Sequence, residues 1–152
     1  MFKPSTSVPK FGEIRLGYVP GDTNRVHRYV GFHPYLVISN NKYNAFSGQC
    51  EVIPFTTKRF GKYNPVHVDF AAGEVEGLLK NSTLVVESRD ILRNDQLGQL
   101  LGTFTPDNWK KVVPAILTQN PILNAMQHMA APPKSTPFPC TPARCQCSGV
   151  VS

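Results

Sequence analysis

Short β-rich runs separated by turn-forming segments are the feature that most constrains how this chain folds. The 152 residues include 14 Pro and 11 Gly, which interrupt helices and argue against an all-helical bundle. Between these breaks, apolar residues alternate with polar ones or form brief apolar runs, as they do in the strands of a small sheet. The predicted strands are EIRLGYV (13–19), YLVISN (35–40), CEVIPFTTK (50–58), PVHVDF (65–70) and STLVVESRDIL (82–92).

The pattern becomes helical after the last predicted strand. TPDNWKKVVPAIL (105–117) predicts a helix with Thr105 as its N-cap, Pro106 at its first position and an apolar stripe at helical spacing. NDQLGQLLGTF (94–104) predicts a shorter helix capped by Asn94. Five strands followed by one or two helices indicate a mainly β protein, built as a small, strongly curved barrel with terminal helices.

Composition divides the chain into three parts. Residues 1–11 read as a flexible lead-in, and residues 12–128 hold the predicted barrel domain. Residues 129–152 are rich in Pro, Ser and Thr without periodicity, which predicts a disordered tail. A long segment, residues 20–33, separates the first two strands, and loops of that length inside a compact domain are usually functional or disordered.

Positive charge is concentrated in the first part of the chain. The formal net charge is +6, and residues 1–62 carry nine Lys or Arg against three acidic residues. Such a basic half fits a polyanionic partner, RNA or DNA first, although the same charge also serves solubility alone. No apolar run approaches the ~20 residues of a membrane span, and the N-terminus lacks the apolar stretch of a secretory signal. We therefore expect a soluble, cytoplasmic protein with no membrane contact.

The four cysteines fall into two groups. Cys50 lies within a predicted strand and is expected to be an ordinary strand residue. Cys140, Cys145 and Cys147 lie in the tail, where their spacing lacks the fourth ligand of a zinc-finger pattern. The sequence therefore predicts no metal site and no cofactor.

Several segments, taken in order, resemble the MazF/PemK family of toxins from toxin–antitoxin pairs. Members of that family carry a segment of the form R-P-x-L-V-I-S-N-D-x-x-N, followed by a strand that ends P-x-T-S/T. The matching segments here are GEIRLGYVPG (12–21), HPYLVISNNKYN (33–44), CEVIPFTTK (50–58), PVHVDF (65–70) and GLLKNSTLVVES (77–88). The resemblance covers residues 12 to 128.

This resemblance implies an SH3-like barrel of about five to seven strands with a C-terminal helix, assembled as a homodimer. It implies a metal-independent endoribonuclease that cuts single-stranded RNA, such as mRNA, at short sequences. A cognate antitoxin would block the site with an extended acidic segment, and the toxin–antitoxin complex would bind DNA.

The resemblance also assigns candidate site residues. Thr56 falls on the family's active-site threonine. His33 stands where the family has its principal arginine, immediately before the motif proline. In the Kid-like branch of the family, a loop histidine and a later acid correspond to His27 and Glu87, whereas the branch's second arginine is replaced by Val85.

Metal-free RNA cleavage needs a base for the 2′-hydroxyl, an acid for the 5′-oxygen and a cation for the charge that gathers on phosphorus. The expected products are a 2′,3′-cyclic phosphate and a free 5′-hydroxyl. We expect His33 to act as the acid or to bind phosphate, with Thr56 orienting the phosphate. The remaining candidates are Arg28 or Arg25 for the permanent charge, His27 or Glu87 as the base, and Lys58, Arg59 and Lys62 along an RNA groove. His67, on an alternating strand, is expected to face outward.

Two other hypotheses stay open at this stage. The exchange of arginine for His33 is compatible with a barrel that has lost catalysis and binds nucleic acid or a protein target, as the similarly folded CcdB toxins do. Alternatively, the tail cysteines make the chain part of a larger assembly, as a metal or crosslinking site.

Overall fold

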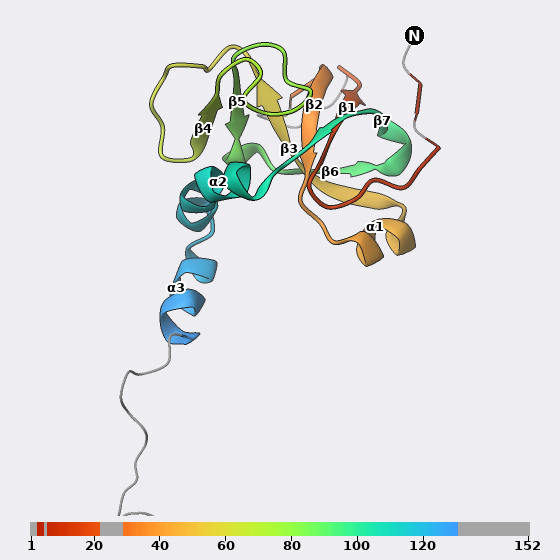
Figure 1. Cartoon of the computed structure of the whole chain (residues 1–152). Helices are drawn as coiled ribbons and strands as arrows, with labels where there is room; N and C mark the ends of the chain where they lie inside the picture. Colours follow the sequence, from red (N-terminus) through yellow and green to blue (C-terminus); the bar gives the residue numbers. More distant parts are fainter. Residues whose placement is uncertain (1–2, 5, 22–28, 131–152) are drawn as a thin grey trace, which may run out of the picture. The chain divides into compact units, whose positions relative to one another are not determined.

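The computed structural model describes residues 3–4, 6–21 and 29–130, and the chain divides into two compact units, Met1–Gln119 and Asn120–Ser152. The first unit holds all the strands and the helix α2, and the second holds α3 (Figure 1). The strands are β1 (Glu13–Val19), β2 (Gly31–Val37), β3 (Gln49–Thr56), β4 (His67–Phe70), β5 (Ser82–Val85), β6 (Asp90–Arg93) and β7 (Leu97–Thr103). The helices are α1 (Asn41–Ser47), α2 (Pro106–Gln119) and α3 (Pro121–Ala130), with short 3-10 turns η1 (Val86–Ser88) and η2 (Asn94–Gln96).

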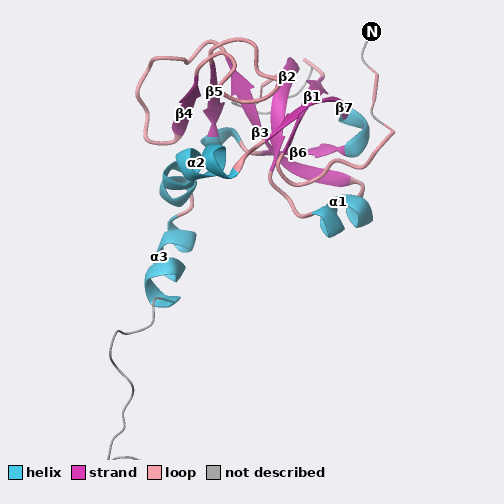
Figure 2. Ribbon diagram, in the orientation of Figure 1, coloured by secondary structure: helices cyan, strands magenta, loops and turns pink. Residues whose placement is uncertain are grey.

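The strands form one antiparallel sheet in the order β4-β5-β3-β2-β1-β7, as the ribbon in Figure 2 shows. β3 changes partner along its length, because its first half pairs with β6 and its last two residues pair with β5. The expectation of a mainly β protein with C-terminal helices is confirmed. The expected closure into a barrel is wrong, since no ladder among the described strands joins β4 to β7 at the two ends of the sheet.

Irregular backbone, in place of a strand ladder, packs against β7. The segment that follows β4 brings Glu76 and Gly77 directly against the backbone of Leu101 and Gly102 in β7. A Cβ on Gly77 would collide with the carbonyl of Leu101, and a Cβ on Gly102 would collide with the carbonyl of Glu76. Because two backbones in such close contact leave no room for side chains, glycine is required on both sides.

Hydrophobic residues are buried on both faces of the sheet, which explains why β3 is apolar along most of its length. The larger cluster packs the aromatic rings of Phe55, Phe70 and Phe104 against Val112 and Ala115 of α2. The smaller cluster lies on the opposite face and consists of Val19, Tyr35, Val37, Cys50, Val52, Leu92 and Leu97. A strand buried on both faces reads as a continuous apolar run, as residues 52–56 do.

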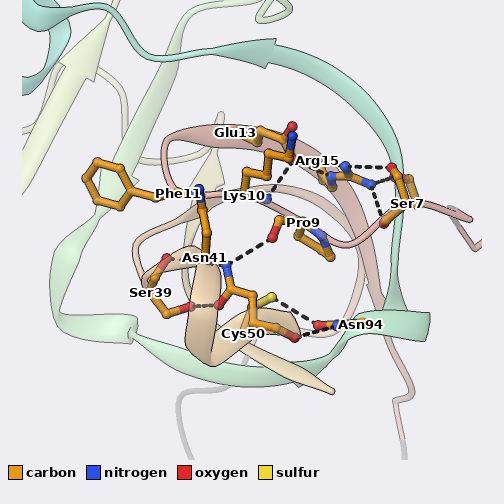
Figure 3. A network of polar contacts seen from close by, with 12 residues as sticks. Ser7, Pro9, Lys10, Phe11, Glu13, Arg15, Ser39, Asn41, Cys50 and Asn94 are labelled. Carbon is orange, nitrogen blue, oxygen red and sulfur yellow. Dashed lines mark hydrogen bonds and ion pairs between the residues drawn. The ribbon is translucent and has the colours of Figure 1, made fainter. Parts of the chain in front are cut away.

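A network of polar contacts joins the segment before β1 to the sheet. Arg15 is only 2% exposed, and its guanidinium makes a 2.8 Å ion pair with Glu13. It also donates to the Ser7 hydroxyl at 3.1 Å (Figure 3). A further hydrogen bond, of 3.3 Å, joins the guanidinium to the carbonyl of Gly98 in β7. The side chain of Asn41 accepts from the backbone N–H of Phe11 at 2.7 Å. The segment from residue 7 to residue 11 is therefore held by side chains of β1 and α1.

Two local predictions were wrong for identifiable reasons. NDQLGQLLGTF was predicted as a helix, but most of it forms β7, because Leu97 to Thr103 pair with β1 and this pairing outweighs the helical spacing of the leucines. NNKYNAFSG (40–48) is rich in the turn-forming residues Asn, Ser and Gly, which predict a turn, but Asn41–Ser47 form α1. Asn40 caps that helix by accepting from Tyr43 N–H at 2.8 Å, and Gly48 ends it with φ of 72°.

The predicted helix at 105–117 is confirmed as α2, and the five predicted strand regions all contain strands. The domain boundaries at residues 11 and 128 stay predictions. The disordered tail was predicted for residues 129–152; α3 extends to Ala130, and residues 131–152 lie outside the described residues.

We predict that Arg15→Met lowers the free energy of unfolding by about 3 kcal/mol, because it leaves Glu13 without its partner in a largely buried site. Urea unfolding followed by tryptophan fluorescence measures the change. Arg93→Met is the matched control, since the Arg93–Asp95 pair is exposed and its loss costs less than about 1 kcal/mol. Equal effects of the two substitutions would contradict this account of the network.

We also predict that Gly77→Ala destabilises the fold by about 2 kcal/mol more than Gly73→Ala does. Both glycines have positive φ, 87° for Gly77 and 81° for Gly73, so placing alanine at this backbone conformation destabilises both variants by a similar free energy. Only Gly77 has backbone within contact of an added Cβ, whereas Gly73 has open space around it. Indistinguishable thermal unfolding of the two variants would show that segment 76–77 does not pack against β7.

Candidate functional site

His33 lies in β2, opposite Gly17 of β1, and its side chain is half-buried. Its Nε2 lies 3.1 Å from the carbonyl oxygen of Val30 and must donate, because a carbonyl only accepts. The Tyr29 ring meets the imidazole edge-on, with 5.5 Å between the ring centroids. His33 is therefore oriented by two residues that lie just before β2.

The register of the central strands relates His33 to Thr56. Tyr35 of β2 is paired with Pro54 of β3. The ladder ends there, and His33 and Thr56 each lie two residues beyond its last pair. Thr56 is 5% exposed and is paired on its other side with Thr83 of β5. The two candidates, more than twenty residues apart in the chain, therefore lie on neighbouring strands at the same end of the β2–β3 ladder.

Asp69 of β4 continues this row of polar residues. It is paired with Thr83, whose hydroxyl donates to Asp69 Oδ1 at 2.6 Å. Asp69 Oδ2 accepts from the backbone N–H of Gly61 at 2.8 Å. Residues 57–66, between β3 and β4, form a loop that carries Lys58, Arg59 and Lys62 and is called the basic loop below. The Asp69 carboxylate joins this loop to β4 and β5.

Glu87 and Arg59 line one hollow. Its volume is about 380 Å³, and Tyr29 and Ser88 complete the described lining. Glu87 comes from η1 and Arg59 from the basic loop, so the hollow combines a carboxylate with a guanidinium. Tyr29 joins the hollow to His33 through the ring contact. Arg59, expected only along an RNA groove, therefore shares a hollow with the proposed base.

His67 is the residue that sequence reasoning missed. It was expected to face outward, but its side chain is only 6% exposed, so that expectation is wrong. Its Nε2 lies 2.8 Å from Oε2 of Glu87. Alternation along β4 places His67 on the face opposite Val68 and Phe70, and it gives no sign that η1 covers that face. His67 is paired with Val85 in the β4–β5 ladder, and Glu87 follows Val85 by two residues. Only knowledge of this pairing could have revealed the contact between His67 and Glu87.

The other basic candidates are exposed or lie outside the described residues. Lys58 and Lys62 are exposed on the basic loop, and Lys62 lines a second hollow of about 530 Å³ together with Tyr63, His67 and Lys111. Arg25, His27 and Arg28 all fall within residues 22–28, outside the described part of the chain. A permanent charge supplied from that segment stays a prediction.

Among the described residues, no group of three or more His, Cys, Asp or Glu side chains is placed to hold a metal ion. Burial raises the pKa of the Cys50 thiol to about 11, and the thiol donates to Asn94 at 3.0 Å. The tail cysteines lie outside the described residues. No described helix is both long enough and apolar enough to cross a membrane.

An open antiparallel sheet followed by helices makes this a mainly β protein. Residues 10–119 match the family described as the PemK-like, MazF-like toxin of type II toxin-antitoxin system. The match covers most of the chain, which therefore belongs to this family. The resemblance found in the sequence is confirmed.

Solved structures of similar fold include proteins from mycobacteria and from Deinococcus radiodurans. An endoribonuclease in complex with its cognate antitoxin, from a mycobacterial species, is 23% identical, with a TM-score of 0.58 over 73% of this chain and 93% of that one. MazF from Deinococcus radiodurans is 22% identical, with a TM-score of 0.60 over 78% of this chain and 98% of that one. The Mycobacterium tuberculosis toxin MazF-mt6 is 18% identical, with a TM-score of 0.56 over 70% and 94% of the two chains. None of the curated proteins matches the chain significantly.

We predict that Asp69→Ala frees the basic loop, because Asp69 accepts the hydrogen bond from Gly61 N–H that holds it. Limited digestion with trypsin should then cut after Arg59 and Lys62 about tenfold faster than in the wild type, as the local opening free energy falls by about 1.4 kcal/mol. Asp95→Ala, which removes an exposed carboxylate bonded to Arg93, is the control. Unchanged cleavage in Asp69→Ala would show that this carboxylate does not hold the loop.

Proposed function

We propose that this protein is a toxin endoribonuclease that cleaves single-stranded RNA, such as mRNA, without a metal ion. The observation that carries the proposal is the hollow in which Glu87 and Arg59 lie together, joined through Tyr29 to His33. Membership of the family supports the same conclusion. The products would be a 2′,3′-cyclic phosphate and a 5′-hydroxyl.

In this mechanism Glu87 takes the proton of the 2′-hydroxyl as the 2′-oxygen attacks phosphorus. The bond from phosphorus to the 2′-oxygen forms and the bond to the 5′-oxygen breaks. His33, in its imidazolium form, gives its Nδ1 proton to the leaving 5′-oxygen, while Nε2–H keeps its hydrogen bond to the Val30 carbonyl. Arg59 binds the equatorial oxygens, because a guanidinium makes two parallel charge-assisted hydrogen bonds to phosphate. His27 is the second candidate for the base, and Arg28 or Arg25 would add positive charge from residues 22–28.

Thr56 would orient the phosphate. Its Oγ1 accepts from the backbone N–H of Lys58 at 3.3 Å, which leaves the hydroxyl proton to donate to a phosphate oxygen. Lys58 and Lys62, exposed on the same loop, would contact flanking phosphates without regard to sequence. The net charge of +6 supports a polyanionic substrate.

We further propose that the chain forms a homodimer in the cytoplasm and is inhibited by a cognate antitoxin, whose complex with the toxin binds DNA. Support comes from the mycobacterial endoribonuclease, which was solved in complex with its cognate antitoxin.

One observation favours a second candidate function. His33 replaces the arginine that the family places before the motif proline, and a neutral imidazole carries no permanent charge for phosphorus. If no other arginine compensates for this exchange, the protein is a catalytically impaired member that binds nucleic acid or a protein target. The position of Arg59 in the hollow favours catalysis over this alternative.

Incubation of the purified full-length protein with a long single-stranded RNA in EDTA tests the proposal. We predict discrete fragments with cyclic-phosphate ends. His33→Ala is expected to reduce the cleavage rate by about 10²–10⁴-fold, because it removes the general acid. Thr56→Val is expected to reduce it by about 10²-fold, because it removes a hydrogen-bond donor at similar volume.

Thr57→Val is the matched control, because Thr57 is the exposed neighbour of Thr56. This variant should cleave RNA at the wild-type rate. Retention of intact RNA in a native gel would support the binding module. Cleavage by His33→Ala at the wild-type rate would remove His33 from the mechanism.

A further inference from the structure

His67 and Glu87 are in contact, but the proposed mechanism assigns a role only to Glu87. His67 projects from β4 and Glu87 from η1, and their side chains meet with Nε2 2.8 Å from Oε2. The imidazole is 6% exposed, whereas the carboxylate is 37% exposed and lines the hollow beside Arg59. A buried group therefore contacts the partly exposed group that would face the substrate.

The direction of this hydrogen bond follows from the chemistry of the two groups. An ionised carboxylate only accepts hydrogen bonds, so Nε2 of His67 carries the proton and donates it. The other ring nitrogen, Nδ1, is buried and has no partner among the described residues. The contact with Glu87 therefore depends on the proton at Nε2.

This contact leaves one carboxylate oxygen available. Oε2 of Glu87 is held by His67, and no second hydrogen bond to Glu87 is formed by the described residues. The carboxylate is thus fixed at one oxygen while Oε1 is left to accept a proton from a ligand in the hollow. A base works only when it lies within hydrogen-bonding distance of the proton that it takes.

We propose that His67 is the positioning residue for Glu87: it donates from Nε2 to Oε2 and so aims Oε1 at the 2′-hydroxyl of the RNA. This role rests on the proposed function, in which Glu87 is the base. His67 acts through Glu87 and does not itself react with the substrate, because its side chain is only 6% exposed whereas that of Glu87 is 37% exposed.

Two substitutions in the full-length protein separate this role from a merely structural one. His67→Phe keeps the ring volume and removes the donor, and we expect kcat to fall by about 10²-fold with KM within about twofold, as for a misplaced base. His67→Gln keeps an N–H donor at the end of its side chain and should restore kcat to within about tenfold of the wild type. Thermal unfolding of each variant, followed by circular dichroism, reports whether the fold is kept.

The outcomes distinguish the two proposals. If the wild type does not cleave RNA, the proposed function fails and this role fails with it. If the wild type cleaves and His67→Phe keeps the wild-type kcat, only the role of His67 fails. Equal loss of kcat in His67→Gln and His67→Phe, both folded, would also overturn the role, because a donor at this position would then make no difference.

A measurement without RNA keeps the inference testable even if His67→Phe does not fold. The ¹⁵N chemical shifts of the imidazole nitrogens report which of them carries the proton. In the wild-type protein we expect Nε2 of His67 to have the chemical shift of a protonated nitrogen. A ring protonated at Nδ1 only would overturn the inference, since Nε2 could then not donate to Glu87.

Discussion

The pairing of β3 with its neighbours is the constraint on which the rest of the structure depends. This strand pairs with β2 on one edge and with β6 and then β5 on the other, so three ladders fix its position. Side chains alternate along a strand, and a slip of one residue would exchange Phe55 and Thr56 between the two faces. Such a slip would place a phenyl ring where the site needs a hydroxyl and a hydroxyl inside the larger core.

The same register links stability to the site. Thr56 is the last residue of β3, beyond the ladder with β2 and next to the start of the basic loop. A residue at the end of a well-packed strand is held in a fixed position by the strand, yet it lies close enough to the surface to contact a ligand. The contacts of Asp69 with Thr83 and Gly61 extend this order to β4 and into the loop. The candidate site is therefore built on paired strands, with a loop that is held at its middle.

Local patterns predicted most of the strands and α2, because alternation and helix caps act over a few residues. They failed for β7, whose leucines are spaced as in a helix but pair with β1, a partner some eighty residues earlier in the chain. They also predicted a closed barrel, since the sequence does not reveal that segment 76–77 packs directly against β7. Interactions between distant segments decided both cases.

In the candidate site, too, the residues in local motifs could be predicted from the sequence, whereas the contacts between distant segments could not. The motif around His33 and the threonine at position 56 were visible in the sequence, because each lies in a short segment with recognisable neighbours. The burial of His67 against Glu87 and the sharing of a hollow by Glu87 and Arg59 depend on how β4, η1 and the basic loop come together. No spacing in the sequence encodes these contacts.

The most direct test of the central claim is an NMR titration of the ¹⁵N-labelled protein with a single-stranded RNA in which every 2′-hydroxyl is methylated, so that no cleavage occurs. If one hollow binds the scissile phosphate, the signals of His33, Thr56 and Glu87 will shift together along a single binding curve. Shifts confined to Lys58 and Lys62, with these three residues unaffected at saturation, would contradict the account.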